Sequence, residues 1–322
     1  MLQDDLKLIR EQLDKAENIA VFTHLRPDGD SVGAALGLGW TLQDAGKTVQ
    51  FVSEDPIPER YQFLFEFAEN GQNPFVREPV GADLYILPDI SSIDRAGKFF
   101  QEHPEIKPDI CIDHHVSNTG FCRFNWIEPD NPAACCVLAE IIPRMGYKLS
   151  LRVSSALLCG IITDTNSFCN SDVTTASLRI AADLADNGAE LFRINRTAHK
   201  EHSVKEMEYW RIGMNNMRIE NGLAWSYLLA SERMAAGIET DEDSGFTSYM
   251  CNTTGIKASV LLTETNDGKV KISWRSVPGY DVAAVAVAFG GGGHKAASGA
   301  TLPGPIGAVI PAVVNKTKEM LF

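Results

Sequence analysis

The chain has 322 residues, with 42 Asp and Glu against 29 Lys and Arg, which gives a net charge of −13 at pH 7. With 44% hydrophobic and 22% charged residues, it has the composition of a globular protein, which excludes disordered, collagenous and coiled-coil classes. The acidic balance argues against a groove for long duplex or single-stranded nucleic acid, because such binding needs many Lys and Arg side chains to neutralise phosphates. It does not exclude a short nucleotide.

The N-terminus and the cysteines indicate a soluble, cytoplasmic protein with no membrane partner. The first residues lack the basic and apolar regions of a secretory signal, and no run approaches the ~18 apolar residues of a membrane span. The seven cysteines are odd in number and lack paired CxxC spacing, so neither a disulfide framework nor a zinc ribbon is expected. We expect reduced cysteines in the core.

Helix and strand patterns alternate along the first part of the chain. They predict a helix near 6–13, a strand at 19–24, a helix at 31–45 and strands at 48–53, 83–87 and 109–112. Further helices are expected at 132–145, at 150–162 with Ser150 as its cap, and at 174–187 before Gly188. The alternation predicts an α/β domain with a mainly parallel sheet over residues 1–189.

The second part of the chain has a different pattern. Residues 190–217 are polar and helix-prone, and we expect them to form an interdomain helical linker. Residues 218–322 predict strands at 222–229, 256–263 and 270–275, a helix at 282–289 and a glycine run at 290–293. This pattern is typical of a smaller α+β domain.

Four clusters of acidic and histidine residues in the first domain lie where predicted strands end, which is where ligands bind in open α/β sheets. An Asp-His-His triplet at a strand exit costs several kcal/mol to bury unless it is coordinated or paired. Taken singly, Asp28 and Asp164 can also be helix caps. The candidate metal ligands are His24, Asp28, Asp30, Asp89, His114 and Asp164. Nitrogen and oxygen donors without thiolate predict two divalent ions, Mn²⁺ first, with Mg²⁺, Co²⁺ or Fe²⁺ as alternatives, a pair suited to phosphoester hydrolysis.

A second group of residues in the C-terminal domain is suited to an anion. Consecutive glycines let backbone N–H groups approach phosphate, and an arginine can bind it bidentately. A lone glycine run is more often a flexible turn, and this one lacks the spacing and position of a dinucleotide-binding motif. The candidate substrate-binding residues are Arg275, Ser276, Gly291, Gly292, Gly293 and His294.

These motifs resemble those of the DHH phosphoesterases. His24-x-x-x-Asp28-x-Asp30 is similar to motif I, Asp89 to motif II, Asp113-His114-His115 to motif III and Asp164 to motif IV. Gly291 to Gly299 is similar to the DHHA1 signature. The two-domain arrangement most resembles the NrnA-type oligoribonucleases (nanoRNases), which implies Mn²⁺-dependent hydrolysis of oligonucleotides of two to a few residues to mononucleotides. It also implies conversion of 3′-phosphoadenosine 5′-phosphate to AMP.

The resemblance also implies roles for individual residues. One ion is held by His24, Asp28 and Asp89, and the other by Asp30, Asp89, His114 and Asp164, with Asp89 bridging. His115 faces the scissile phosphate and Asp113 orients a histidine, while the DHHA1-like residues hold the distal phosphate or nucleoside across the interdomain cleft. Homodimers are plausible on the same basis. The sequence Asp89-Ile90-Ser91-Ser92 departs from the Asp-Thr/Ala-Ser pattern of the family's motif II but keeps its carboxylate.

Several rivals share part of this pattern. A cyclic di-AMP or linear dinucleotide (pApA) phosphodiesterase has the same two domains. A family II pyrophosphatase lacks the glycine-rich domain, and a RecJ-like nuclease needs further strand-binding domains and a basic channel. A catalytically silent nucleotide sensor is disfavoured because the whole ligand set is present. Polarity of digestion and preference for RNA or DNA stay open.

Overall fold

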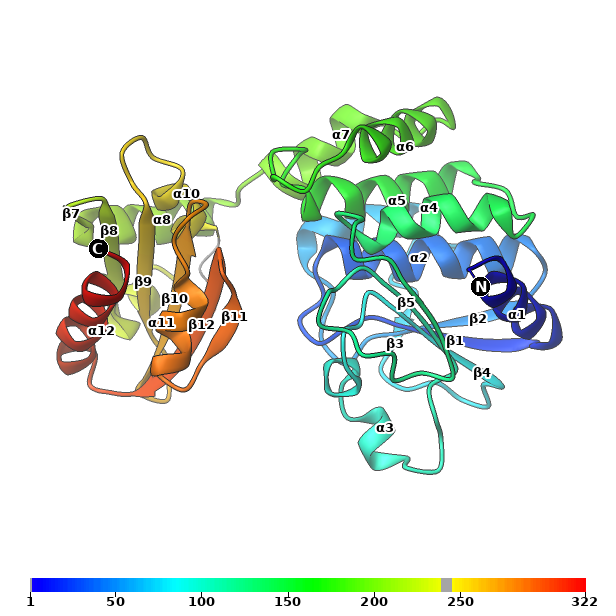
Figure 1. The fold of residues 1–322 in the computed structure, drawn as a ribbon, viewed down its shortest axis with the longest axis horizontal. Coiled ribbons are helices and arrows are strands. Elements are labelled where there is room, and N and C mark those ends of the chain that lie inside the picture. The colour runs from blue at the N-terminus through cyan, green and yellow to red at the C-terminus, as the bar shows by residue number, and fades with distance from the viewer. Residues whose placement is uncertain (1, 239–244) are drawn as a thin grey trace. The chain divides into compact units, whose positions relative to one another are not determined.

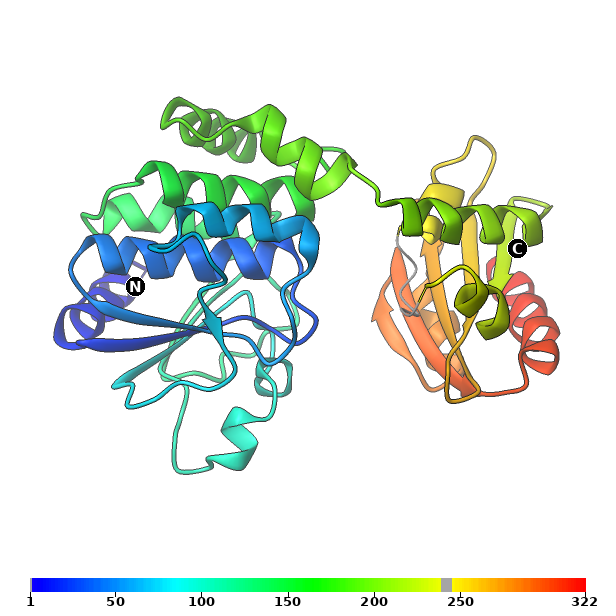
Figure 2. The same cartoon turned by 180° about the vertical axis from the view of Figure 1, so that it is seen from behind.

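The computed structural model describes residues 2–238 and 245–322. The chain forms two compact units, Met1–Glu201 and His202–Phe322 (Figures 1 and 2). The division falls within the stretch expected to be a helical linker. In the described part of the chain, no helix is both long and apolar enough to cross a membrane.

The first unit is built on a six-stranded sheet with the strand order β3-β2-β1-β4-β5-β6. Every neighbouring pair in it is parallel. The carboxyl ends of the strands therefore lie at one edge, where side chains from different strands can meet. The strands are β1 (Asn18–Phe22), β2 (Thr48–Val52), β3 (Phe75–Val76), β4 (Leu84–Pro88), β5 (Ile110–Asp113) and β6 (Phe124–Ile127).

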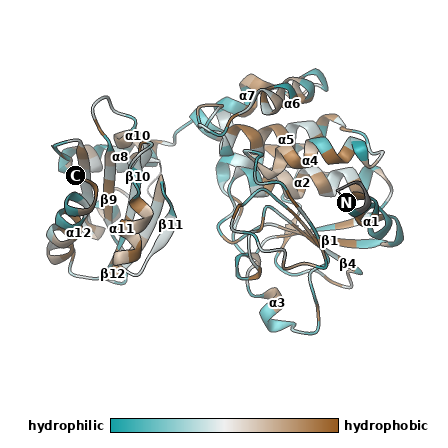
Figure 3. Cartoon of the chain, viewed as in Figure 1, coloured by the Kyte–Doolittle hydropathy of each residue, from teal (hydrophilic) through white to brown (hydrophobic). Residues whose placement is uncertain are grey.

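Helices cover both faces of this sheet because successive strand residues point to opposite sides. Ile19 and Val21 belong to the larger core cluster, with α2, α4 and α5, while Phe22 packs against Phe99 and Phe100 on the other face. Figure 3 shows the largely hydrophobic central helices α4 and α5. The helices are α1 (Leu2–Lys15), α2 (Gly29–Asp44), η1 (Glu59–Phe67), η2 (Ile93–Ala96), α3 (Phe99–Glu102), α4 (Ala134–Arg144), α5 (Leu151–Asp164), α6 (Thr175–Asp186), α7 (Leu191–Asn195) and η3 (Arg196–Lys200).

The predicted α/β class with a parallel sheet is confirmed, but three details differ. Asp164 ends helix α5 and does not follow a strand. Ser150 precedes α5 without capping it through its side chain, because its hydroxyl donates a hydrogen bond to Asp44. Cys169 is exposed, whereas the other six cysteines are buried, so the expectation of an all-core set is wrong at that position.

The second unit is a mixed sheet with the order β11-β12-β10-β9-β8-β7, which confirms the smaller α+β domain. Only the pair β8–β9 is parallel. Helices α11 and α12 pack on one face and α8 and α10 on the other. The elements are α8 (Val204–Asn216), β7 (Arg218–Glu220), β8 (Leu223–Leu228), α9 (Ala230–Ala235), α10 (Phe246–Cys251), β9 (Ala258–Glu264), β10 (Lys269–Ser276), α11 (Val282–Ala288), β11 (Gly292–His294), β12 (Ala297–Pro303) and α12 (Ile306–Leu321).

Candidate active site

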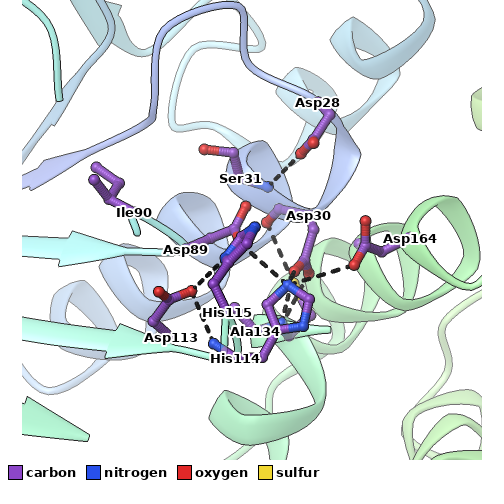
Figure 4. A network of polar contacts seen from close by, with 12 residues as sticks. Asp28, Asp30, Ser31, Asp89, Ile90, Asp113, His114, His115, Ala134 and Asp164 are labelled. Atoms are coloured by element: carbon purple, nitrogen blue, oxygen red, sulfur yellow. Dashed lines mark hydrogen bonds and ion pairs between the residues drawn. The ribbon is translucent and has the colours of Figure 1, made fainter. Parts of the chain in front are cut away.

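Eight acidic and histidine side chains from five elements meet at the carboxyl edge of the first sheet. Figure 4 labels all of them except His24. The strand ends of β1, β4 and β5 supply most of the group, and the start of α2 and the end of α5 supply the rest. Three sets within this group have candidate ligand atoms within 4.8 Å of one another. These sets are His24 with Asp28 and Asp89, Asp30 with His114 and Asp164, and Asp89 with Asp113, His114 and His115.

The first set centres on the His24 imidazole. His24 Nε2 lies 3.4 Å from Asp28 Oδ2 and 3.5 Å from Asp89 Oδ2. His24 Nδ1 lies 2.9 Å from the Leu25 carbonyl oxygen, which can only accept a hydrogen bond. When that bond forms, the ring proton is on Nδ1 and the Nε2 lone pair faces the two carboxylates, as a metal-binding imidazole requires.

The second set centres on His114. His114 Nδ1 lies 3.2 Å from the Asn131 carbonyl oxygen, while Nε2 faces Asp164 Oδ2 at 3.5 Å, Asp89 Oδ1 at 3.6 Å and Asp30 Oδ2 at 3.8 Å. Here too a backbone carbonyl selects the tautomer that turns Nε2 toward carboxylates. Asp89 lies beside both imidazoles, with one oxygen near each.

Asp30 is fixed by the beginning of another helix. Its two carboxylate oxygens accept hydrogen bonds from the backbone N–H groups of Ala134 at 2.6 Å and Cys135 at 3.0 Å, in the first turn of α4. The positive end of the helix dipole also favours a carboxylate there. A Cβ at Gly160 would lie 2.7 Å from Asp30 Oδ1, so the close approach of α5 requires glycine at this position.

Asp89 is strained and partly unsatisfied. It has φ +57°, an uncommon conformation for a residue other than glycine and one often found at functional sites. Its Oδ1 is buried and accepts no hydrogen bond from the described residues. A buried carboxylate oxygen without a donor is costly. The orphaned oxygen and its oxygen and nitrogen neighbours fit hard divalent cations.

Crowding of carboxylates perturbs the ionisation of the group. Burial, together with the negative charges of Asp30 and Asp28, raises the pKa of Asp89 well above its usual range. Burial and Asp30 likewise raise the pKa of Asp164. Burial opposes a charge on His114, but the nearby carboxylates outweigh it and raise the pKa of the imidazole. Without a cation, this cluster therefore disfavours full ionisation of its acids.

These shifts predict how pH affects the stability of the metal-stripped protein. A carboxyl group whose pKa is raised by folding stabilises the fold when protonated, and that stability is lost as the pH rises through the raised pKa. We therefore expect Asp89→Asn to have a higher melting temperature than the wild type near pH 7.5. The gap should shrink as the pH falls toward 4. Calorimetry in the presence of a chelator from pH 4 to 7.5 measures it, and a gap that widens in acid would contradict the assignment.

Asp113 and His115 form a hydrogen-bonded chain that ends at Asn118. His115 Nδ1 lies 2.8 Å from Asp113 Oδ1, and Asn118 Nδ2 donates to Asp113 Oδ2 at 2.6 Å. Burial opposes the Asp113 charge, but these bonds outweigh it and lower the pKa of the carboxyl group. His115 is thereby held with Nδ1 on Asp113, which leaves Nε2 for a ligand.

The predicted substrate-binding residues of the second unit divide between the two faces of its sheet. Arg275 is paired with Ala297, which is paired with His294, so Arg275 and His294 share a face across three strands. Ser276 points to the opposite face, and its hydroxyl donates to the Tyr280 carbonyl oxygen at 2.7 Å. Gly292 and Gly293 lie in the edge strand β11, while Gly291 directly precedes it.

Two further residues of the site were not predicted. Asn118 ties Asp113 to the Ile90 carbonyl oxygen, 3.1 Å away. Arg95, in η2, lies with Nη2 3.0 Å from His24 Nδ1. In the sequence, Asn118 is marked only by its position soon after the Asp113–His115 triplet, and Arg95 only by its position soon after Asp89. No local pattern predicts the contacts of Asn118 with Ile90 and of Arg95 with His24, because each joins two separate loops.

Comparisons with known proteins find relatives that match both units of the chain. The model of the DHH family, N-terminal domain, matches residues 18–161, and that of the DHHA1 domain matches residues 226–321. A Thermus thermophilus protein, a bifunctional oligoribonuclease and PAP phosphatase NrnA, is 30% identical over 304 residues, which cover 94% of this chain and 89% of the relative. A Bacillus subtilis protein of the same name is 25% identical over 89% of this chain and 90% of its own. The crystal structure of an exopolyphosphatase-related protein from Bacteroides fragilis has a TM-score of 0.89 at 23% identity, covering 98% of this chain and 96% of its own.

Proposed function

Because the chain belongs to the DHH family of phosphoesterases and carries a DHHA1 domain, we propose that it hydrolyses oligonucleotides of two to a few residues to mononucleotides, using two divalent ions. We further propose 3′-phosphoadenosine 5′-phosphate as a second substrate. Mn²⁺ is the proposed ion, and the cytoplasm the proposed location. One observation carries the proposal, namely that the buried Asp89 carboxylate lies between two imidazoles with an oxygen that no described residue satisfies.

The proposed ligand sets follow the geometry of the two imidazoles. His24, Asp28 and Asp89 would hold one ion, and Asp30, Asp89, His114 and Asp164 the other. Ions bound there would lower the pKa of a water molecule and neutralise charge on the phosphoryl group. The backbone carbonyls of Leu25 and Asn131 keep each Nε2 available.

The chain's own acid–base group in this proposal is His115. Its Nδ1 is engaged by Asp113, and its side chain is 28% exposed, so Nε2 can reach a substrate. Protonated at Nε2, the imidazole would donate a hydrogen bond to a phosphoryl oxygen or a proton to the leaving oxygen. Asp113 would stabilise that protonated form and fix the ring.

The DHHA1 unit is proposed to bind the part of the substrate distant from the cleaved bond. Arg275 and His294 share a sheet face beside the glycine-containing strand β11, and both suit a phosphate. The Ser276 hydroxyl is already used within its own turn, which leaves Arg275 as the principal anion-binding side chain.

Replacing Arg275 by alanine is expected to raise KM for a 5′-phosphorylated dinucleotide about tenfold and to leave kcat within about twofold, because uniform binding affects KM alone. Steady-state kinetics of the Mn²⁺-loaded protein measure both constants. Arg218→Ala is the matched control. Arg218 lies in β7, the edge strand at the other end of the sheet from β11, and like Arg275 it donates to a neighbouring backbone carbonyl. An unchanged KM in Arg275→Ala would remove this residue from the site.

A competition assay tests the proposed substrate class. Metal-stripped protein is reloaded with Mn²⁺ and offered a 5′-phosphorylated RNA dinucleotide, 3′-phosphoadenosine 5′-phosphate, cyclic di-AMP and pyrophosphate. We expect the linear dinucleotide to have the highest kcat/KM and the bisphosphate to be cleaved as well. If cyclic di-AMP or pyrophosphate has the highest kcat/KM instead, the proposed substrate is wrong, although the proposed metal site stands.

A further inference from the structure

Arg95 lies beside the proposed ligand His24 but belongs to neither proposed ligand set. Its backbone carbonyl oxygen accepts a hydrogen bond from Leu25 N at 2.7 Å, which fastens η2 to the loop after β1. Its Nη2 lies 3.0 Å from His24 Nδ1. Among the described residues, that ring nitrogen is the only hydrogen-bond partner of the Arg95 side chain, and no carboxylate forms an ion pair with it.

The two contacts of His24 Nδ1 exclude each other. The Leu25 carbonyl oxygen, 2.9 Å away, can only accept, so this bond needs a proton on Nδ1. The guanidinium of Arg95 can only donate, so its contact needs a bare Nδ1. With Nδ1 bare, a neutral ring carries its proton on Nε2, the atom that faces Asp28 and Asp89. His24 can therefore ligate an ion through Nε2 only when Nδ1 carries the ring proton. In that state Nδ1 cannot accept a hydrogen bond from Arg95.

We propose that Arg95 is a substrate-binding residue whose guanidinium leaves His24 Nδ1 when Nε2 becomes a ligand, and then binds a phosphoryl oxygen of the substrate. This inference rests on the proposed phosphoesterase function. The guanidinium is permanently charged, and its planar set of donors matches phosphate. Asp28 and Asp89 lie beside the imidazole that Arg95 contacts, and their negative charges repel an anionic substrate, so a cation at this place favours its binding.

The alternative role for Arg95 is to hold His24 in place as a ligand, and the two roles predict opposite effects on metal affinity. If Arg95 positions His24, its removal weakens Mn²⁺ binding. If Arg95 competes for Nδ1 and then leaves, its removal keeps Mn²⁺ affinity equal or makes it tighter. Only the second role also gives Arg95 a direct share in phosphate binding.

Titration calorimetry measures the affinity of wild-type protein, Arg95→Ala and Arg95→Gln for Mn²⁺ alone. It then measures their affinity for AMP, a stable phosphate-bearing probe. We expect both variants to bind Mn²⁺ at least as tightly as the wild type. We expect AMP affinity for the Mn²⁺-loaded variants to fall about tenfold and kcat/KM for the dinucleotide to fall about 10²-fold. Arg179→Ala is the control, because Arg179 is exposed on α6 of the same unit.

Two results would overturn the exchange: weaker Mn²⁺ binding in both correctly folded variants, or unchanged AMP affinity. A match of melting temperature to the wild type identifies the folded variants, and Arg95→Gln retains most of the side chain if Arg95→Ala does not fold. Failure of the proposed function is distinguishable, because it appears as a lack of dinucleotide turnover in the wild type. The Mn²⁺ and AMP comparison among variants does not depend on that turnover.

Discussion

Replacing Asp89 by asparagine is expected to lower kcat/KM by about 10³-fold or more while the fold persists, because each proposed ion loses a charged ligand. The same substitution should raise the melting temperature of the first unit of the metal-stripped protein by about 2–4 °C, the effect of about 1 kcal/mol in a unit of this size. The rise is expected because asparagine removes a buried charge from a cluster that raises the pKa of Asp89. A residue that is costly to the fold and essential to turnover is retained for function.

Kinetics in saturating Mn²⁺ and calorimetry in chelator measure the two effects on one preparation. Asp94→Asn is the matched control, since Asp94 is an exposed carboxylate five residues along the chain. It should change neither quantity. Near-normal turnover of Asp89→Asn would show that the cluster around Asp89 is not where hydrolysis takes place.

Replacing His115 by glutamine is expected to lower kcat by about 10²- to 10⁴-fold, the usual contribution of a positioned proton donor. Mn²⁺ affinity should stay close to that of the wild type, because His24 and His114 are the proposed imidazole ligands. This outcome separates His115 from the alternative set in which Asp89, Asp113, His114 and His115 hold an ion. Single-turnover rates and Mn²⁺ titrations measure the two quantities.

A matched control accompanies His115→Gln. His103→Gln, at the C-terminal end of α3, should keep both kcat and Mn²⁺ affinity close to those of the wild type. A tenfold or greater loss of Mn²⁺ affinity in His115→Gln would instead make His115 a ligand.

The sequence allowed the fold class to be predicted because the buried strands β1, β4 and β5 are short apolar runs separated by helical patterns. The edge strands β3 and β11 have two and three residues and little burial, so no periodic signal predicts them. The glycine run illustrates the problem, because Gly292 and Gly293 lie in strand β11 although a glycine run by itself is more typical of a flexible turn.

The site was predictable where residue type and strand position coincide, as at Asp89 and Asp113. Its finer organisation depends on contacts between distant segments. Asp30 meets the first turn of α4 from 104 residues away, and no local pattern encodes that bond. The contacts of Arg95 with His24 and of Asn118 with Ile90 likewise join loops that meet only in the folded chain. By contrast, the opposite directions of Arg275 and Ser276 follow from strand alternation alone.

If the carboxylate and imidazole cluster is a two-ion hydrolytic centre, turnover must depend on the number of ions that it holds. A Mn²⁺ titration of the metal-stripped wild type, with bound ions and dinucleotide turnover followed together, measures this dependence. We expect two ions per chain, no turnover before Mn²⁺ is added, and activity that rises as the second ion binds. Full turnover in the metal-stripped protein, or saturation of activity at a single ion per chain, would contradict it.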